Sequence, residues 1–556
     1  MTQIKFSLTA NTVKIKYQLP QSDKRLFDIA EQSVKSGLAL FTGDALSTLI
    51  LAIGSILMAR FLGPEGYGLY SLTLTMPTIM LSLIALGIDQ AVIRFPARLI
   101  VEDKPDRILS ILKSAVAFRF LTALVMWLIC FLFSGIFATH LLNRPEIGFY
   151  IKISSFLIIT QSFFTLLYNV FIGLGISERG AAIKILMSII KSTLAPTLII
   201  IGLGIVGAIT AHVLSYAAAS LSGVVILYLD QYRKLKALAN KDELPSSSFA
   251  PNLRLMISYG LPLYISSLLL ILMDQYRLLL LAHNVSDLEI GNFQAAGNFV
   301  ALLTVISAPM ALAIFPAFSK LEAGSSDMNK AFQYSVKYTS MVLAPASAFT
   351  IVMSRSMVEI VYGHEYALAP LFLSLYAAIY LYSVFGSVVL GNFFSGIGDT
   401  MVNLRATLIY SAIFAPLATI LTYLYHVPGL IVSILISSIA NIMYCIHMAA
   451  RKYAVGIDYQ TSIRILLASW IAALTLVPFT QNTWLPNYIS LIIGIIIYPA
   501  AYLTILPILK ALNKTDLENL NMFLGRYKLI KPIMNLITKY ESKIIWQISR
   551  RARREN

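Results

Sequence analysis

Apolar runs of about 20 residues alternate with short polar segments along most of the chain. Because an α-helix rises about 1.5 Å per residue, a run of this length crosses the hydrocarbon core of a bilayer. The pattern therefore predicts an all-α polytopic membrane protein with about 14 transmembrane helices. The predicted helices lie near residues 37–60, 68–92, 115–138, 149–173, 180–201, 205–228, 255–282, 290–318, 333–356, 368–395, 402–425, 428–449, 463–480 and 487–509.

The composition of the chain also indicates a membrane protein. Of its 556 residues, 58% are hydrophobic and 13% are charged, and the mean hydropathy is +0.76. Soluble globular proteins carry about 25% charged residues, so a soluble fold is excluded. Much of the net charge of +16 lies in the tail, where the segment from Lys510 onward holds eleven Lys or Arg residues. Since the cytoplasmic leaflet is anionic, membrane lipids are the expected partner of this tail, and nucleic acid is not.

The distribution of Lys and Arg among the loops predicts the orientation. With both termini in the cytoplasm, the predicted inner loops hold eighteen Lys or Arg residues, whereas the outer loops hold only Arg60, Arg144 and Arg355. Cytoplasmic loops are enriched in these residues, and an error of one helix would exchange the two sets of loops. We therefore expect an even number of helices, with both termini in the cytoplasm.

The two halves of the chain share short motifs. The segments 169–175 and 392–398 both read N-x-F-x-G-x-G, at an offset of 223 residues, and Gly68 matches Gly291 at the same offset. The dipeptide Ala-Pro at 195 and the tripeptide Phe-Pro-Ala at 95 each recur 220 residues later. Because each half holds an even number of predicted helices, the halves are predicted to be parallel repeats related by an axis along the membrane normal.

These repeats and one long polar interruption divide the chain into expected units. The units are a cytoplasmic N-terminal segment (1–33), a lobe of helices 1–6 (34–228), a cytoplasmic linker (229–254), a lobe of helices 7–12 (255–449), a final helix pair (450–510) and a basic amphipathic cytoplasmic tail (511–556). We call residues 34–228 the N-lobe and residues 255–449 the C-lobe. In the tail, isoleucines on one helical stripe opposite Lys and Arg predict a helix that lies in the membrane interface.

Residues 60–70, R-F-L-G-P-E-G-Y-G-L-Y, lie between the first two apolar runs. Gly63 and Pro64 are expected to break the first helix, and Gly66 and Gly68 to let the chain enter the second. The whole string, which includes Glu65 and Tyr67, resembles the same turn in polysaccharide flippases of the multidrug/oligosaccharidyl-lipid/polysaccharide (MOP) exporter superfamily.

The resemblance implies both a fold and a function. It implies two pseudo-symmetric six-helix bundles that form a V around a central cavity, with a further C-terminal helix pair. It implies a flippase in the plasma or inner membrane that moves a polyprenyl-diphosphate-linked glycan to the outer leaflet by alternating access, for polysaccharide or glycan biosynthesis. A coupling cation, H⁺ or Na⁺, and glycan-assembly enzymes are the further partners expected. Neither an enzyme activity nor a cofactor is expected.

Charged residues inside the predicted helices are the candidate substrate-cavity residues. Each costs about 2.5 to 3.5 kcal/mol at the centre of a membrane helix unless it faces protein or water. Because Asp274 and Arg277 are three residues apart on one helix, they either neutralise each other or meet ion and substrate separately. The candidates are Asp44, Arg119, Lys191, Asp274 and Arg277, and the three cations are the candidates for binding a diphosphate.

Other site classes find little support in the sequence. Residues 202–207 spell G-x-G-x-x-G, but the motif follows an apolar helix rather than a strand and is interpreted as a tight turn between two membrane helices. The six histidines have no metal-ligand spacing, so no metal is expected. The alternative functions are a multidrug or organic-cation antiporter of the same superfamily, an integral-membrane glycosyltransferase or ligase, and a lipid scramblase.

Overall fold

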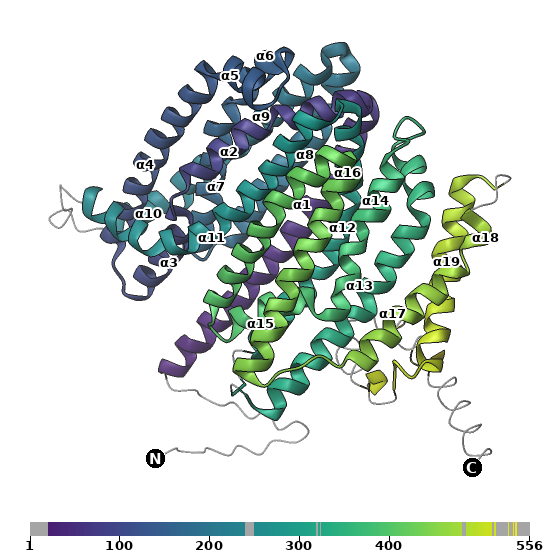
Figure 1. Ribbon diagram of the computed structural model, residues 1–556. Coiled ribbons are helices and arrows are strands. Elements are labelled where there is room, and N and C mark those ends of the chain that lie inside the picture. The colour runs from purple at the N-terminus through teal and green to yellow at the C-terminus, as the bar shows by residue number, and fades with distance from the viewer. Residues whose placement is uncertain are drawn as a thin grey trace, which may run out of the picture.

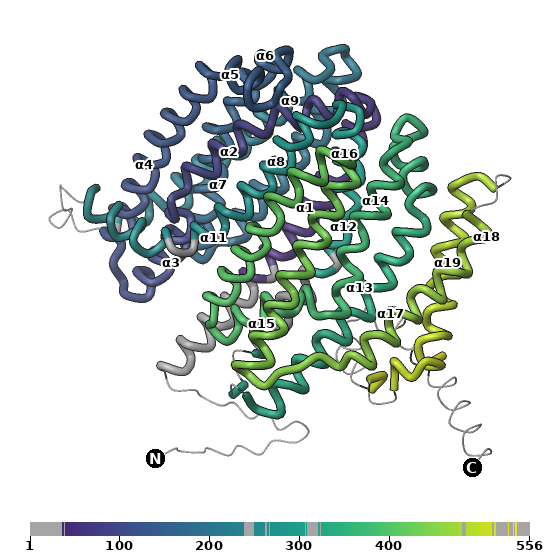
Figure 2. Tube along the Cα trace, in the orientation of Figure 1, coloured from purple at the N-terminus to yellow at the C-terminus, as the bar shows by residue number. Residues whose placement is uncertain are grey.

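The computed structural model describes residues 21–238, 249–318, 321–322, 324–480, 485–513, 516–518, 532, 538 and 540–541, and all regular structure in these ranges is helical (Figures 1 and 2). The first half contains α1 (Gln21–Thr73), α2 (Thr75–Ile84), α3 (Ile88–Val101), α4 (Pro105–Leu132), α5 (Ser134–Ile136), η1 (Phe137–Leu141), η2 (Pro145–Ile147), α6 (Gly148–Ser154), α7 (Phe156–Gly173), α8 (Ser177–Leu198), η3 (Ile199–Leu203), α9 (Gly204–Leu227), η4 (Tyr228–Tyr232) and α10 (Arg233–Leu238). The second half contains α11 (Phe249–Asn284), α12 (Asp287–Phe318), α13 (Ser326–Val361), α14 (Ala369–Ala377), η5 (Ala378–Phe385), α15 (Ser387–Gly396), α16 (Thr400–Tyr453), α17 (Tyr459–Leu474), α18 (Val477–Thr480) and α19 (Asn487–Ile508).

Two long helices join the halves of the molecule. In Figure 1 the blue N-lobe helices lie on one side, the green C-lobe helices lie in the centre, and α17 to α19 lie at the far side. Helix α1 packs against α8 of its own lobe and against α12 of the C-lobe. Helix α11 contacts α2, α3 and α4 of the N-lobe and α16 of its own lobe. Tyr264 of α11 donates to the Ser82 carbonyl oxygen at 2.6 Å, whereas Tyr276, three turns later, lies 3.3 Å from the Ala415 carbonyl oxygen.

Long apolar helices confirm a polytopic membrane protein. Seven helical stretches in the described residues are long and apolar enough to span a bilayer, or eight when the bent pair α14–η5 and α15 is included. Three of them, Ala39–Ile84, Ser177–Ala237 and Thr400–Tyr453, have 46, 61 and 54 residues. Since one crossing takes about 20 residues, each has room for two. The number of fourteen transmembrane helices stays a prediction.

Local breaks divide these long stretches. The backbone leaves the helical region at Gly63 in α1, at Gly202 in η3 and at His426 in α16. Gly202 and Gly204 have φ of 101° and 49°, conformations that glycine adopts without strain. The G-x-G-x-x-G segment is therefore the predicted tight turn between two helices.

The repeated N-x-F-x-G-x-G motif forms the same helix end twice. At the end of α7, the Gly175 N–H donates to the Ile172 carbonyl oxygen and the Ile176 N–H to that of Phe171, both at 3.0 Å. At the end of α15, Gly398 donates to Ser395 at 3.2 Å and Asp399 to Phe394 at 2.9 Å. Both glycines have positive φ, 73° and 83°. This is the Schellman arrangement, which places glycine where the chain turns left-handed after a helix.

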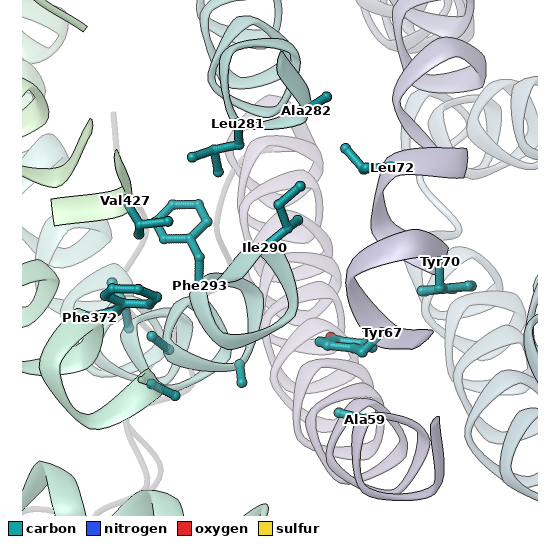
Figure 3. Packing of buried hydrophobic residues seen from close by; sticks show 14 of the residues in the cluster. Ala59, Tyr67, Tyr70, Leu72, Leu281, Ala282, Ile290, Phe293, Phe372 and Val427 are labelled. Atoms are coloured by element: carbon teal, nitrogen blue, oxygen red, sulfur yellow. The ribbon is translucent and has the colours of Figure 1, made fainter. Parts of the chain in front are cut away.

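The largest buried apolar cluster lies between the two halves. Figure 3 shows Tyr67 and Leu72 of α1 near Ile290 and Phe293 of α12, with Leu281 of α11 close by. Burial of apolar side chains from both halves joins them at the end of the molecule that carries the 60–70 segment. Most of the basic tail predicted to form an interfacial helix, and part of the linker, lie outside the described residues.

Candidate functional site

The 60–70 segment bends α1 at one residue. Gly63 has φ 69° and ψ 171°, a region that is essentially restricted to glycine, and Pro64 follows it. Gly66 and Gly68 have helical backbone, which differs from the prediction that they provide conformational freedom. Glu65 is exposed, and Tyr67 is 5% exposed.

Gly68 provides close approach between the lobes. A Cβ atom on Gly68 would lie 2.0 Å from the Asp287 carbonyl oxygen and 3.0 Å from the Gly291 nitrogen. A Cβ atom on Gly291 would lie 1.7 Å from the Pro64 carbonyl oxygen. The two glycines matched by the sequence repeat therefore meet each other, as expected for residues beside the axis that relates two halves.

Arg144 also connects the two lobes, close to the contact between Gly68 and Gly291. Arg144, in the N-lobe, donates through Nε to Asp287 Oδ1 at 3.0 Å. Its other nitrogens donate to the carbonyl oxygens of Ala282 at 3.0 Å and Val285 at 2.8 Å, at the α11–α12 junction. Both charged side chains are about 15% exposed, so solvent screens this pair less than a surface pair.

A hydrogen-bond chain leads from Tyr67 to a cavity in the C-lobe. Asn298 of α12 donates to the hydroxyl oxygens of Tyr67 at 2.9 Å and Tyr362 at 3.1 Å. Asn298 also lines a cavity of about 480 Å³ between α11, α12 and α14. The turn between the first helices and this cavity are thus linked by one amide side chain.

The cavity brings together two of the charged candidates. Asp274 and Arg277 of α11 line it and form an ion pair, and Arg277 also donates to the Tyr376 hydroxyl oxygen at 3.0 Å. The Asp274 side chain is 59% exposed and that of Arg277 is 18% exposed. Both readings of the i,i+3 spacing remain compatible with this geometry, because the two groups are paired and also reach the cavity.

Asp44 has partners on two N-lobe helices. Its Oδ1 accepts from Lys184 Nζ of α8 at 2.8 Å and from the Tyr168 hydroxyl of α7 at 2.9 Å. The Asp44 side chain is 44% exposed. It lies in the other lobe from Asp274, so the structure does not bring the two carboxylates together.

Lys191 lies in a separate N-lobe cluster. Its Nζ is 3.1 Å from His212 Nε2, and His212 Nδ1 is 2.9 Å from the Tyr70 hydroxyl. His212 and Tyr70 are 8% and 4% exposed. Lys191 has no oppositely charged partner among the described residues, whereas each of the other four candidates has one.

Arg119 is held inside the N-lobe. It forms an ion pair with Asp89 of α3, and its side chain is 3% exposed. A buried ion pair satisfies both charges where water is excluded, and removal of one partner is costly. This geometry places Arg119 in a bridge between α3 and α4.

Comparison with known proteins identifies the family. Residues 57–369, more than half of the chain, match the family described as "Polysaccharide biosynthesis protein". The chain belongs to this family. The matched segment includes the Gly63 bend, four of the five charged candidates and the α11–α12 wall of the cavity.

A curated relative and several solved structures are similar to this chain. The "Probable low-salt glycan biosynthesis flippase Agl15" of Haloferax volcanii is 23% identical over 235 residues, 42% of this chain and about half (49%) of that protein. The inward closed lipid II flippase MurJ matches 86% of this chain and 99% of its own, with TM-score 0.67 and 15% identity. An inward-facing MATE multidrug transporter of the MOP superfamily matches 73% and 94%, with TM-score 0.59 and 16% identity. These likenesses show a MOP-type fold and confirm the predicted fold class.

Sequence reasoning missed the uncharged members of the site. Asn298, Tyr376 and His212 are single polar residues within apolar helices and belong to no motif. A polar amide in a membrane helix was the available signal for Asn298. The partners of Asp44 and Arg119 come from helices distant in sequence, so pattern alone could not pair them.

Proposed function

We propose that this protein is a flippase that moves a polyprenyl-diphosphate-linked oligosaccharide from the cytoplasmic to the outer leaflet for glycan or polysaccharide biosynthesis. Membership in the polysaccharide biosynthesis family carries the proposal, and the MOP-type fold with a cavity lined by Asp274 and Arg277 supports it. Transport by alternating access fits two lobes that meet through α1 and α11. The role is transport rather than catalysis.

The terminal helices favour a flippase over a multidrug antiporter. Helices α17 and α19 pack on α13, with the Tyr498 hydroxyl donating to the Pro345 carbonyl oxygen at 2.9 Å and the Tyr502 hydroxyl to that of Met341 at 3.1 Å. The lipid II flippase covers 86% of this chain, whereas the MATE transporter covers 73%. The structural match to the lipid II flippase thus extends over more of this chain than the match to that MATE transporter.

The charged candidates have different proposed roles. Arg277 reaches the cavity and offers a guanidinium fork that matches phosphate oxygens, so it is the proposed contact for the diphosphate. Lys191 is a second cation for the same purpose, because no carboxylate neutralises it among the described residues. Asp274 and the half-exposed Asp44 are the proposed contacts for a coupling H⁺ or Na⁺. Arg119 has a structural role, because Asp89 neutralises it away from solvent.

The proposed location is the plasma or inner membrane, with both termini in the cytoplasm. The asymmetric distribution of Lys and Arg supports this orientation. The end that carries the Gly68–Gly291 contact then faces outward. Enzymes that assemble the glycan on either side of the membrane are the proposed functional neighbours.

A reconstituted assay tests the function. Purified protein is placed in liposomes with lipid-linked oligosaccharide extracted from the source organism, and an impermeant glycosidase is added outside. Flipping makes the inner-leaflet glycan accessible, so cleavage proceeds beyond the outer-leaflet fraction. Cleavage that stops at the level of protein-free liposomes would contradict the proposal.

A further inference from the structure

The apolar segment from Ala369 to Gly396 is not a continuous α-helix. Helix α14 gives way to the eight-residue 3-10 helix η5, and α15 begins after Gly386, where φ is 75°. The two parts of the segment differ in direction by 52°. Runs of 3-10 helix longer than about 3 to 4 residues are uncommon, and irregular backbone at membrane depth is tolerated where it is buried in protein or lines a cavity. The break therefore marks η5 as a candidate ligand site.

Two cavities adjoin η5. The cavity of about 480 Å³ between α11, α12 and α14 lies on one side, and a cavity of about 340 Å³ bounded by α15 and α16 lies on the other. Ile379 and Tyr380 of η5 line both cavities. Each volume is within the range of about 300 to 1,000 Å³ found for small-molecule sites. The two cavities share these residues, and together we call them the η5 region, which extends from the α11–α12 wall to α16.

The lining of the two cavities combines apolar surface with polar side chains and carries little net charge. The smaller cavity has no charged residue in its lining, and in the larger one Asp274 and Arg277 neutralise each other. The half-buried amides of Gln294 and Asn441 have no hydrogen-bond partner within the described part of the chain, so their donors and acceptors are free to bind a ligand. The polar lining of the smaller cavity consists of Tyr380, Tyr382, Ser387, Thr407, Tyr410, Ser438 and Asn441.

We propose that this region binds the uncharged sugar residues of the transported glycan, an assignment that rests on the proposed function. A sugar hydroxyl both donates and accepts hydrogen bonds, as amide and hydroxyl side chains do, and the C–H face of a sugar ring packs on tyrosine rings. Arg277 lies in the α11–α12 part of the region, so a diphosphate bound there would direct the attached sugars toward η5. An organic cation would favour a carboxylate, and the lining of the smaller cavity contains none.

Two lipid substrates test the assignment in proteoliposomes. One is a polyprenyl diphosphate that carries a single sugar, and the other is the lipid-linked oligosaccharide extracted from the source organism. The replacements Gln294→Leu and Asn441→Leu remove the two amides. Since each hydrogen bond contributes about 0.5 to 1.5 kcal/mol, flipping of the oligosaccharide lipid should fall about tenfold or more, with little change for the single-sugar lipid.

Gln161→Leu is the matched control. Gln161 is half-buried on α7, its side-chain amide has no hydrogen-bond partner among the described residues, and it lines neither cavity. This control should flip both lipids like wild type. If the double variant unfolds, the single variants Gln294→Leu and Asn441→Leu are tested in its place. The melting temperature in detergent shows which variants are folded.

The results distinguish failure of the proposed sugar site from failure of the proposed flippase function. Wild type that flips neither lipid refutes the proposed function itself. If wild type flips both lipids, the sugar site is tested by the folded variants. Variants that flip both lipids at the wild-type rate, or that lose both activities equally, refute the sugar site and leave the proposed function intact. Equilibrium dialysis with tetraphenylphosphonium provides a further check, because binding that is lost in the double variant would assign the region to an organic cation and overturn the proposal.

Discussion

Asp274 and Arg277 show how one helix can carry charge into an apolar environment. They lie three residues apart, so they face the same side of α11 and pair without help from another helix. The Tyr376 hydroxyl accepts a further hydrogen bond from Arg277. The pair therefore neutralises its own charges and lines the cavity, where either member can exchange its partner for a ligand.

Replacing both members of this pair should be tolerated better than replacing one. Asp274→Asn or Arg277→Gln alone leaves an unpaired charge inside the protein, which is the costly state, whereas the double variant leaves none. The double variant should melt near the wild-type temperature and flip the lipid-linked oligosaccharide poorly, because the phosphate and cation contacts are gone.

Arg277→Lys separates charge from geometry. It retains the positive charge and loses the planar fork, so its flipping rate should fall while expression stays near wild type. A double-neutral variant that flips at the wild-type rate in the same proteoliposome assay would remove both residues from the mechanism.

Asp399 gives a pH-dependent prediction outside the membrane helices. The hydrogen bond from Lys452, at 2.9 Å, lowers the pKa of the Asp399 carboxyl from its ordinary value of 3.8. A carboxyl whose pKa is lower in the folded protein stabilises it above the unfolded pKa, and this stabilisation is lost as the pH falls through the folded pKa. Asp399→Asn should therefore lower stability at pH 7 by about 1 kcal/mol or less, since Lys452 is half-exposed.

The pH dependence of melting in detergent checks this prediction. The melting temperatures of Asp399→Asn and wild type should converge as the pH falls below 3.8. A difference that stays constant from pH 7 to pH 3 would show that the carboxylate charge does not contribute.

At the scale of elements, the contact between α1 and α12 depends on the absence of two side chains. In Gly68→Ala the new Cβ atom would meet the Asp287 carbonyl oxygen, which belongs to backbone and cannot rotate away. Overpacking of this kind costs about 1 to 3 kcal/mol, so the melting temperature should fall. Gly391→Ala on α15 is the control, because nothing lies within 4 Å of its Cβ position. Equal melting of the two variants would argue against a tight contact.

The repeat is the part of the fold that the sequence predicted in most detail. The N-x-F-x-G-x-G motif required glycine at a left-handed position, and the same capping hydrogen bonds occur after α7 and α15. Apolar runs predicted the helical membrane fold for a similarly local reason. The 3-10 form of η5 could not be predicted in this way, because its sequence A-I-Y-L-Y-S-V-F is as apolar as that of a regular membrane helix.

The site was less predictable than the fold for a physical reason. The cost of a buried charge draws attention to Asp44, Arg119 and Lys191 in the sequence. Whether each charge is neutralised depends on a helix elsewhere in the chain, such as α3 for Arg119 and α8 for Asp44. Contacts of that kind arise only when the helices pack.

At the scale of the whole molecule, the orientation in the membrane can be tested with single cysteines. Asn284 ends α11 beside the Arg144 contact, and Asn513 follows α19. A cysteine at 284 should react with an impermeant maleimide on intact cells, and one at 513 should react only after lysis. Both native cysteines, Cys130 and Cys445, are buried, so background labelling should be low. Labelling of residue 513 on intact cells would reverse the proposed orientation.

The Gly68–Gly291 contact also has a consequence for the time course of transport. Flexible side chains can adjust while two helices separate, whereas the backbones of α1 and α12 are in direct contact at these glycines and have no side chain that can adjust. Packed contacts of this type are bistable rather than continuously deformable. The end of the molecule that carries this contact should therefore open in one abrupt step, with a single rate constant and no partly open intermediate.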